Sequence, residues 1–279
     1  MNNSYPSGTI EEINLHQINE SDIQKKSIEL YNYLRIITVG TDTQKIPQIL
    51  KHIELWRKQS ECWLVCIYIL SSAIPQPTQA DAGIYFSVLN ILLHKLQSDF
   101  YQLPGELHGR LREVLFAFLR SLSQHHIRQP LAKLSEAVAA LSLQMEGWPA
   151  PIDDVIRMFG GTAAEAPCAI HALMFMPEIT TKENVRVRSG RRKEYAAYLN
   201  GELGKVFEFL KCWLQNSGSD EELQGLIFKC LREWFYTCGV SLEIVKSSPL
   251  TAAMFLALSK PNLFDTAIDC ICELVSVAK

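Results

Sequence analysis

The stretch from Phe100 to Trp148, FYQLPGELHGRLREVLFAFLRSLSQHHIRQPLAKLSEAVAALSLQMEGW, decides the fold. Behind Pro104, and again behind Pro130, apolar residues recur at steps of three and four, which places each set on a single helix face. A short polar turn, residues 123–128, separates the two sets. The pattern predicts a helical hairpin with Leu115 and Leu134 buried between its helices.

The same pattern repeats along the whole chain, and almost no segment alternates with period two. The hairpins recur about every 40 residues, the period of HEAT or armadillo repeats. The sequence therefore predicts an all-α fold, an alpha-alpha superhelix (a HEAT/armadillo-type solenoid) of about six hairpins. The expected helices are 22–38, 43–58, 61–73, 79–97, 105–122, 129–146, 151–160, 165–176, 191–215, 220–236, 249–259 and 262–278.

Composition limits the functional classes. The 279 residues are 48% apolar and 20% charged, with a net charge of −3, so no overall attraction to nucleic acid is expected. The longest nearly apolar stretch, residues 62–74, is too short to span a membrane. We expect no nucleic-acid partner and no membrane insertion. The eight cysteines lie mostly in apolar helical runs and are expected to be reduced thiols.

The domain prediction is a disordered acidic segment, residues 1–21, followed by one HEAT-repeat domain, residues 22–279. The N-terminal segment contains no Lys or Arg and does not resemble a signal peptide. The last expected helix runs to the end of the chain without a polar capping helix. Because solenoids normally cap both ends, we expect the domain to be truncated at its C-terminus.

Nothing in the sequence predicts catalysis. The glycines form no phosphate loop: Gly160-Gly161 stops a helix, and Gly201-x-x-Gly204 lies inside one. The spacing of the close cysteine pairs differs from that of zinc sites. No histidine has a Ser, Cys or Asp partner at a sequence spacing that suggests a catalytic nucleophile. We therefore expect no enzyme activity, no cofactor and no metal site.

One charge cluster lies between the fourth and fifth hairpins. It contains Lys182, Arg186, Arg188, Arg191, Arg192 and Lys193 against the single acid Glu183. The cluster is either a solvated loop or an anchor for an acidic surface, since arginine binds carboxylates in bidentate fashion. The candidate partner-binding residues in it are Arg191, Arg192 and Lys193.

Polar stripes on two second helices supply the other candidates. In the helix 79–97 the stripe is Ser87, Asn90, His94 and Gln97, and in the helix 129–146 it is Lys133, Glu136 and Gln144. Such stripes are either solvated faces or part of the concave surface that solenoids use to bind partners.

Several short motifs resemble the importin-beta superfamily of transport receptors, in the branch that contains transportin-SR and importin-thirteen. The resemblance is good from about residue 80 to the end, and most matching residues are core and turn positions. The motifs are Asp99–Pro104 with His108, Leu111–Arg112 and Leu115; Leu141–Met145 with Trp148; Arg191–Glu194 after a corner at Pro177-Glu178; Phe228–Leu231 with Trp234–Phe235; and Asp269–Cys272.

The resemblance implies the N-terminal part of a nuclear import receptor that binds the GTP form of the small GTPase Ran. It also implies protein cargo, with serine/arginine-rich proteins as one class, nucleoporins as partners, a monomeric state, and shuttling between cytoplasm and nucleus. Two alternatives stay open, an exportin of the same superfamily and a HEAT-repeat scaffold unrelated to transport. The family runs to some 20 repeats, more than this chain holds.

Overall fold

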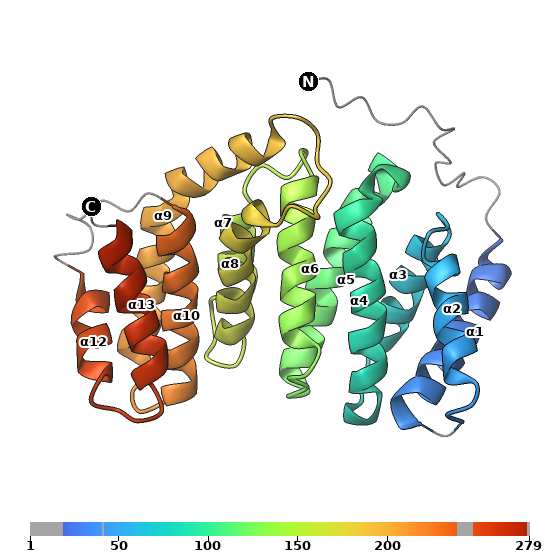
Figure 1. Ribbon diagram of the computed structural model, residues 1–279, viewed down its shortest axis with the longest axis horizontal. Helices are drawn as coiled ribbons and strands as arrows, with labels where there is room; N and C mark the ends of the chain where they lie inside the picture. The colour runs from blue at the N-terminus through green and yellow to red at the C-terminus, as the bar shows by residue number, and fades with distance from the viewer. Residues whose placement is uncertain (1–18, 41, 239–247, 278–279) are drawn as a thin grey trace. The chain divides into compact units, whose positions relative to one another are not determined.

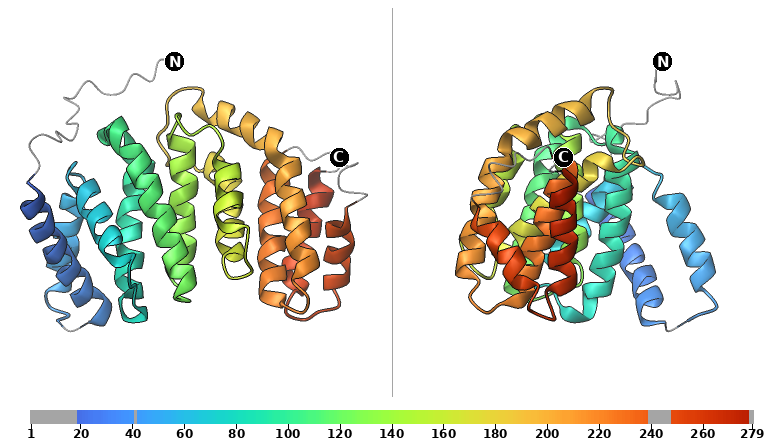
Figure 2. Two further views of the ribbon diagram at one scale, coloured as in Figure 1. Left: turned by 180° about the vertical axis from the view of Figure 1, so that it is seen from behind. Right: turned by 60° about the vertical axis from the view of Figure 1, so that its left-hand side comes forward.

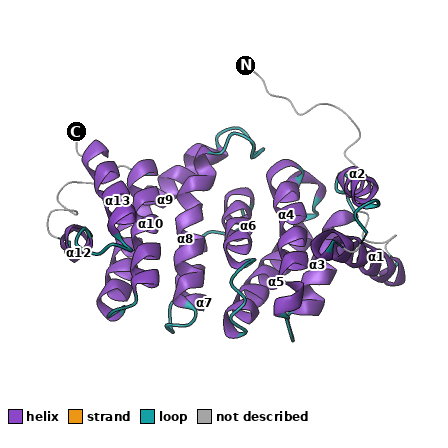
Figure 3. Ribbon diagram, turned by 60° about the horizontal axis from the view of Figure 1, so that its bottom comes forward, coloured by secondary structure: helices purple, strands orange, loops and turns teal. Residues whose placement is uncertain are grey.

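The computed structural model describes residues 19–40, 42–238 and 248–277 (Figure 1). Within these ranges it contains twelve α-helices, two short 3-10 helices and no strand (Figure 3). The predicted all-α fold class is confirmed. The α-helices are α1 (Glu20–Val39), α2 (Ile46–Trp56), α3 (Cys62–Ala73), α4 (Ala82–Ser98), α5 (Gly105–Gln124), α6 (Leu131–Gln144), α7 (Pro151–Phe159), α8 (Ala166–Thr181), α9 (Arg191–Asn216), α10 (Glu221–Thr237), α12 (Pro249–Ala257) and α13 (Phe264–Val277); the 3-10 helices are η2 (Gln79–Asp81) and η3 (Phe100–Gln102).

Each of the twelve predicted segments corresponds to one helix of the structure, with ends displaced by a few residues. The helices group into two compact units. The first contains residues 1–145 together with 184–189, and the second contains residues 146–183 and 190–279. The domain prediction placed all residues after 21 in one domain. Residues 1–18 of the expected acidic segment lie outside the described residues, and α1 already begins at Glu20.

The first unit stacks its helical pairs side by side. The first helices of the pairs form one row, with α1 against α3 and α3 against α5, while the second helices α4 and α6 pack together. Tyr85 of α4 meets Phe118 of α5 edge to face, with ring centroids 5.3 Å apart. This two-row arrangement is the packing expected of HEAT-type hairpins, in which each pair buries its stripe against the next.

The hairpin of α5 and α6 forms as its sequence predicts. Leu115 and Leu134 are both fully buried, as expected. Pro104 and Pro130 are the N-cap residues of α5 and α6, so each lies one position before the first residue of its helix. Ser121 Oγ of α5 donates a hydrogen bond to the Ile74 carbonyl oxygen at the end of α3, over 2.6 Å.

The second unit repeats the two-row packing. The second helices α8, α10 and α13 lie in one row, and the first helix α9 contacts both α7 and α12 (Figure 2). Within the row of second helices, a buried polar contact joins α8 and α10. Trp234 of α10 is fully buried, and its Nε1 donates to the Leu173 carbonyl oxygen of α8 over 2.9 Å.

Helix α8 differs from the sequence expectation. The corner expected at Pro177-Glu178 does not form, because α8 continues through Pro177 to Thr181. Proline inside a helix removes one backbone hydrogen bond and usually ends or kinks the helix. Here the last turn is held from outside by Arg192, as described below.

Helix α9 contains both Gly201 and Gly204, as predicted. Its first turns run at an angle to its later turns (Figure 2). A Cβ atom added at either glycine would meet nothing within 4 Å. Glycine lowers helix stability in an open helix interior, and glycine pairs are common sites of helix bending.

The eight cysteines are all free thiols, and most of them are buried. Cys62, Cys66, Cys168, Cys230, Cys238 and Cys270 are buried free thiols, whereas Cys212 and Cys272 are exposed. Cys272 lies on the solvent side of α13, because a step of two residues in a helix rotates it away from the buried Cys270.

We predict that Leu115→Ala lowers the free energy of unfolding by about 2–5 kcal/mol, since the side chain is fully buried and its removal leaves a cavity. Urea denaturation followed by circular dichroism measures the loss. Leu50→Ala is the matched control, because Leu50 is 51% exposed and should change stability by less than about 0.5 kcal/mol. Equal losses in the two variants would contradict the hairpin packing.

A second pair of substitutions compares Gly204, whose surroundings are open, with Gly160, whose surroundings are crowded. Gly204→Ala should raise the free energy of unfolding by about 0.5–1 kcal/mol, since its surroundings are open and alanine favours helix. Gly160→Ala should lower it by about 1–3 kcal/mol, because the new Cβ would meet the Ile156 carbonyl oxygen and lie 2.8 Å from the Phe209 ring. Thermal unfolding of both variants checks the opposite signs.

Candidate partner-binding surface

The four candidates on α4 have different environments. Ser87 is half-buried, and its Oγ donates to the Gly83 carbonyl oxygen within the helix, over 2.9 Å. Asn90 is exposed, His94 is half-buried and Gln97 is buried. Of the four, Asn90 is therefore the side chain most open to an incoming partner.

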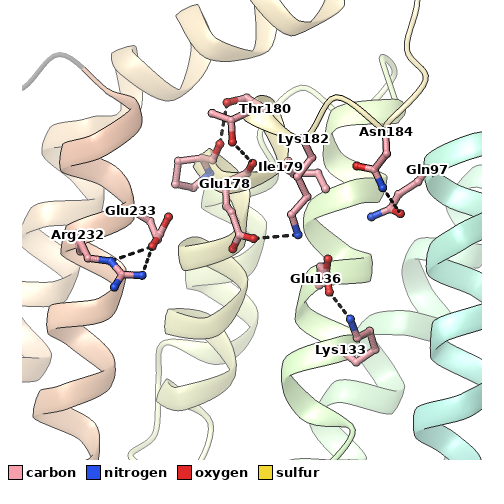
Figure 4. Close-up of polar contacts among 12 residues, drawn as sticks. Gln97, Lys133, Glu136, Glu178, Ile179, Thr180, Lys182, Asn184, Arg232 and Glu233 are labelled. Atoms are coloured by element: carbon pink, nitrogen blue, oxygen red, sulfur yellow. Dashed lines mark hydrogen bonds and ion pairs between the residues drawn. The ribbon is translucent and has the colours of Figure 1, made fainter. Parts of the chain in front are cut away.

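The three candidates on α6 are engaged in internal contacts. Lys133 Nζ and Glu136 Oε2 form an ion pair of 2.6 Å between side chains that are largely buried (Figure 4). Gln144 Nε2 donates to the Leu96 carbonyl oxygen at 2.7 Å and to the Arg186 carbonyl oxygen at 2.8 Å. Gln144 thus connects the end of α4 to a distant part of the chain.

Residues 184–189, which we call the strap, lie against α4 and α6 in the first unit. Arg186 N donates to the Gln97 carbonyl oxygen over 2.6 Å, and Asn184 Nδ2 donates to Gln97 Oε1 over 3.2 Å (Figure 4). The strap buries one apolar side chain, Val185, which is 2% exposed. The structure therefore brings Gln97 and Gln144 together, and both hold the strap.

Lys95 is fully buried at the same end of α4. Its ammonium donates to the Gln59 carbonyl oxygen and to Asp99 Oδ2, each at 3.2 Å, and to Gln102 Oε1. It also lies 5.7 Å from the centre of the Trp63 ring, within the range of a cation–π contact. These contacts fix the turn after α2 and the helix η3 against α4.

Sequence reasoning missed Lys95, although a signal was present. The residues around it in α4 are largely apolar, and a lysine at a buried helical position needs oxygen partners. Its partners Gln59 and Gln102 lie 36 and 7 residues away, so they could not be assigned from spacing alone.

His94 lies among positive charges. Burial is the largest cause that lowers the pKa of its imidazole below the ordinary value, and the guanidinium of Arg57 acts in the same direction. Lys95 and Arg186 add to the shift, while Asp99 opposes it. These contributions favour the neutral imidazole, and among the described residues its Nδ1 is buried without a hydrogen-bond partner.

Within the basic cluster 182–193, Arg192 closes the end of α8. Its guanidinium donates to the carbonyl oxygens of Thr180 at 2.8 Å, Lys182 at 2.7 Å and Ile179 at 3.4 Å. Burial lowers the pKa of this guanidinium and Glu183 opposes the shift. These bonds satisfy carbonyl groups that the last turn of a helix leaves unpaired.

Among the other members of the cluster, some side chains contact neighbouring residues and others are exposed to solvent. Lys182 Nζ pairs with Glu178 Oε1 at 2.9 Å (Figure 4), and the Arg191 guanidinium lies 5.5 Å from the Tyr195 ring centre. Arg186 and Lys193 are exposed. The sequence cluster is therefore several separate features, of which Arg192 serves the fold.

A separate cavity of about 460 Å³ lies between α1, α2 and the start of α3. It is lined in part by Tyr33, His52 and Trp56. Lys26 pairs with Glu61 at its wall. Among the described residues, no group of three or more His, Cys, Asp or Glu side chains could hold a metal ion, and no helix is long and apolar enough to cross a membrane.

Comparison with known protein families identifies the family to which these helical pairs belong. The family described as exportin 1-like protein matches residues 125–271, more than half of the chain. The chain belongs to the exportin 1-like family. With the relatives below, this match places it in the importin-beta superfamily of nuclear transport receptors, which confirms the resemblance carried by the sequence motifs.

Curated relatives of this exportin 1-like chain include Importin-13. The human protein is 26% identical over 215 residues, covering 72% of this chain and 21% of its own length. Importin-13 of Gallus gallus is 29% identical over 154 residues, covering 52% of this chain and 16% of its own. The uncharacterized protein C11G11.07 of Schizosaccharomyces pombe is 25% identical over 258 residues, covering 90% of this chain and 26% of its own. The chain thus spans about a quarter or less of the length of these relatives.

The role of Arg192 in this exportin 1-like fold is testable. Arg192→Gln should lower the free energy of unfolding by about 1–3 kcal/mol, because it removes charge-assisted bonds to three carbonyl groups. Lys193→Gln is the neighbouring control and should change stability by less than about 0.5 kcal/mol, since Lys193 is exposed. Chemical denaturation measures both, and an unchanged Arg192 variant would refute the capping role.

Proposed function

We propose that the chain is a segment of a nuclear transport receptor that binds the GTP form of Ran and protein cargo. The observation that carries the proposal is the match to the exportin 1-like family over residues 125–271, together with Importin-13 among the relatives. On this proposal the chain performs no catalysis, and its work is reversible binding of other proteins. It shuttles between cytoplasm and nucleus as a monomer and contacts nucleoporins on the way.

The proposed Ran surface is formed by the second helices of the first three pairs, α2, α4 and α6. The accessible polar side chain on the α4 part of this surface is Asn90. Ser87 and His94 are half-buried beside it. Gln97 and Gln144 contribute indirectly in this proposal, because they position the strap.

Import is the proposed direction, with serine/arginine-rich proteins as one proposed cargo class. An import receptor binds Ran-GTP and cargo with negative coupling, so each partner weakens the other by the same factor. An exportin would show the opposite sign. Measuring cargo affinity with and without Ran-GTP distinguishes the two directions, and a HEAT-repeat scaffold would respond to Ran in neither way.

The test of Ran binding is a pull-down with Ran loaded with a non-hydrolysable GTP analogue, and with GDP as the nucleotide control. We expect recovery with the GTP form only. Asn90→Arg should weaken the recovery, because a larger charged side chain would enter the proposed surface, whereas Asn200→Arg on α9 should not. If the folded chain, checked by helical circular dichroism, is not recovered with either nucleotide, the Ran proposal fails.

A further inference from the structure

Three basic residues lie in two segments that are hydrogen-bonded to the C-terminal end of α4 and its surroundings. Arg57 and Lys58 lie in the turn after α2, which Lys95 and Gln102 hold against α4 through the Gln59 and Lys58 carbonyl oxygens. Arg186 lies in the strap, which Gln97 and Gln144 hold against the same helix. All of these residues belong to the first unit.

The hydrogen bonds of the two segments bring them to the same end of α4. The turn is bonded by Lys95, and the strap by Gln97, only two residues further along the helix. His94 precedes both of these residues, and besides burial, Arg57 and Arg186 both contribute to the lowered pKa of its imidazole. Among the described residues, the Nε of Arg57 and the Nδ1 of His94 are buried without a hydrogen-bond partner.

The charges of this cluster are only partly neutralised by the protein. Among the described residues, Arg186 and Lys58 are exposed and form no ion pair, and Arg57 pairs only with Glu54, at 3.8 Å. The nearby acid Asp99 is already paired with the buried Lys95. An exposed ion pair such as Arg57–Glu54 contributes little, so it can give way to a stronger partner.

We propose that Arg57, Lys58 and Arg186 form a docking site for an acidic segment of a partner protein at the C-terminal end of α4. Guanidinium groups suit carboxylates, because each can donate two parallel hydrogen bonds. The proposal transfers the expected acid-binding role from residues 191–193 to the first unit. It stands beside the proposed transport function and does not rest on Ran binding.

The strap is the part that positions Arg186. Its hydrogen bonds to the helices use its own main chain and Asn184, while Val185 anchors it by burial. The Arg186 side chain is left exposed above a fixed backbone. Fixing the backbone in advance reduces the entropy lost when a partner binds.

A protein partner fits these charges better than nucleic acid. Affinity for nucleic acid grows with the number of phosphates that cations neutralise, and this site offers only three cations on a chain of net charge −3. A short run of Asp or Glu residues needs no more than two or three such contacts.

The test measures binding of a short fluorescein-labelled glutamate peptide to the full chain by fluorescence polarisation at low salt. Arg186→Ala should weaken binding about tenfold, the size expected for loss of one charge-assisted contact. Lys193→Ala is the matched control, since Lys193 is also basic and exposed, and it should change affinity by less than about twofold. Binding that is unchanged in the Arg186 variant would overturn the proposal.

Two further measurements sharpen the result. Gln144→Leu should also weaken peptide binding although Arg186 is retained, because it releases the strap, and unchanged binding by this variant, with its helical circular dichroism intact, would overturn the positioning role. A labelled oligouridine of equal charge should bind more weakly than the peptide. If the oligonucleotide binds as tightly and depends equally on Arg186, the site is one for nucleic acid and the proposal is wrong. The assay contains no Ran, so its failure leaves the transport proposal intact.

Discussion

The buried ammonium of Lys95 is the interaction on which the polar architecture of the first unit depends. A charge that is fully removed from water costs several kcal/mol unless its donors are satisfied. Here three oxygen atoms and the Trp63 ring surround it, and they come from the turn after α2, from α3, from the C-cap of α4 and from η3. Satisfying this one cation therefore fixes three segments that apolar packing alone would leave free to slide. The end of α4 becomes a rigid platform, and the strap and the basic side chains are arranged around it.

The strap shows how a helical repeat protein can separate positioning from recognition. Gln97 and Gln144 hold it mostly through main-chain groups, which every residue type except proline offers in full. Side chains such as Arg186 then remain available for a partner. The strap lies within residues 125–271, the part of the chain that matches the exportin 1-like family.

The fold was largely predictable because the information for a helical hairpin is local. The stripes around Leu115 and Leu134 specify both helices and their buried faces. The expectation failed at Pro177, where α8 continues for another turn. The Leu173 carbonyl oxygen, to which Pro177 cannot donate, accepts a hydrogen bond from the distant Trp234 instead. The site was less predictable for the same reason. Gln97 lies 87 residues from its partner Asn184, and a polar stripe in a sequence looks the same whether it contacts solvent or the chain itself.

The three carbonyl contacts of Arg192 also bear on how this protein can change during evolution. They join the end of α8 to the start of α9, so the residues between them close a loop whose two ends are already held together. The entropy of closing such a loop grows only slowly with its length, by about 0.6 kcal/mol for each doubling. Insertions and substitutions in the loop therefore change the stability of the helices on either side only slightly. On the docking proposal, selection can vary the charge of the strap, and so alter which acidic segments are bound, while the stacked helices stay as they are.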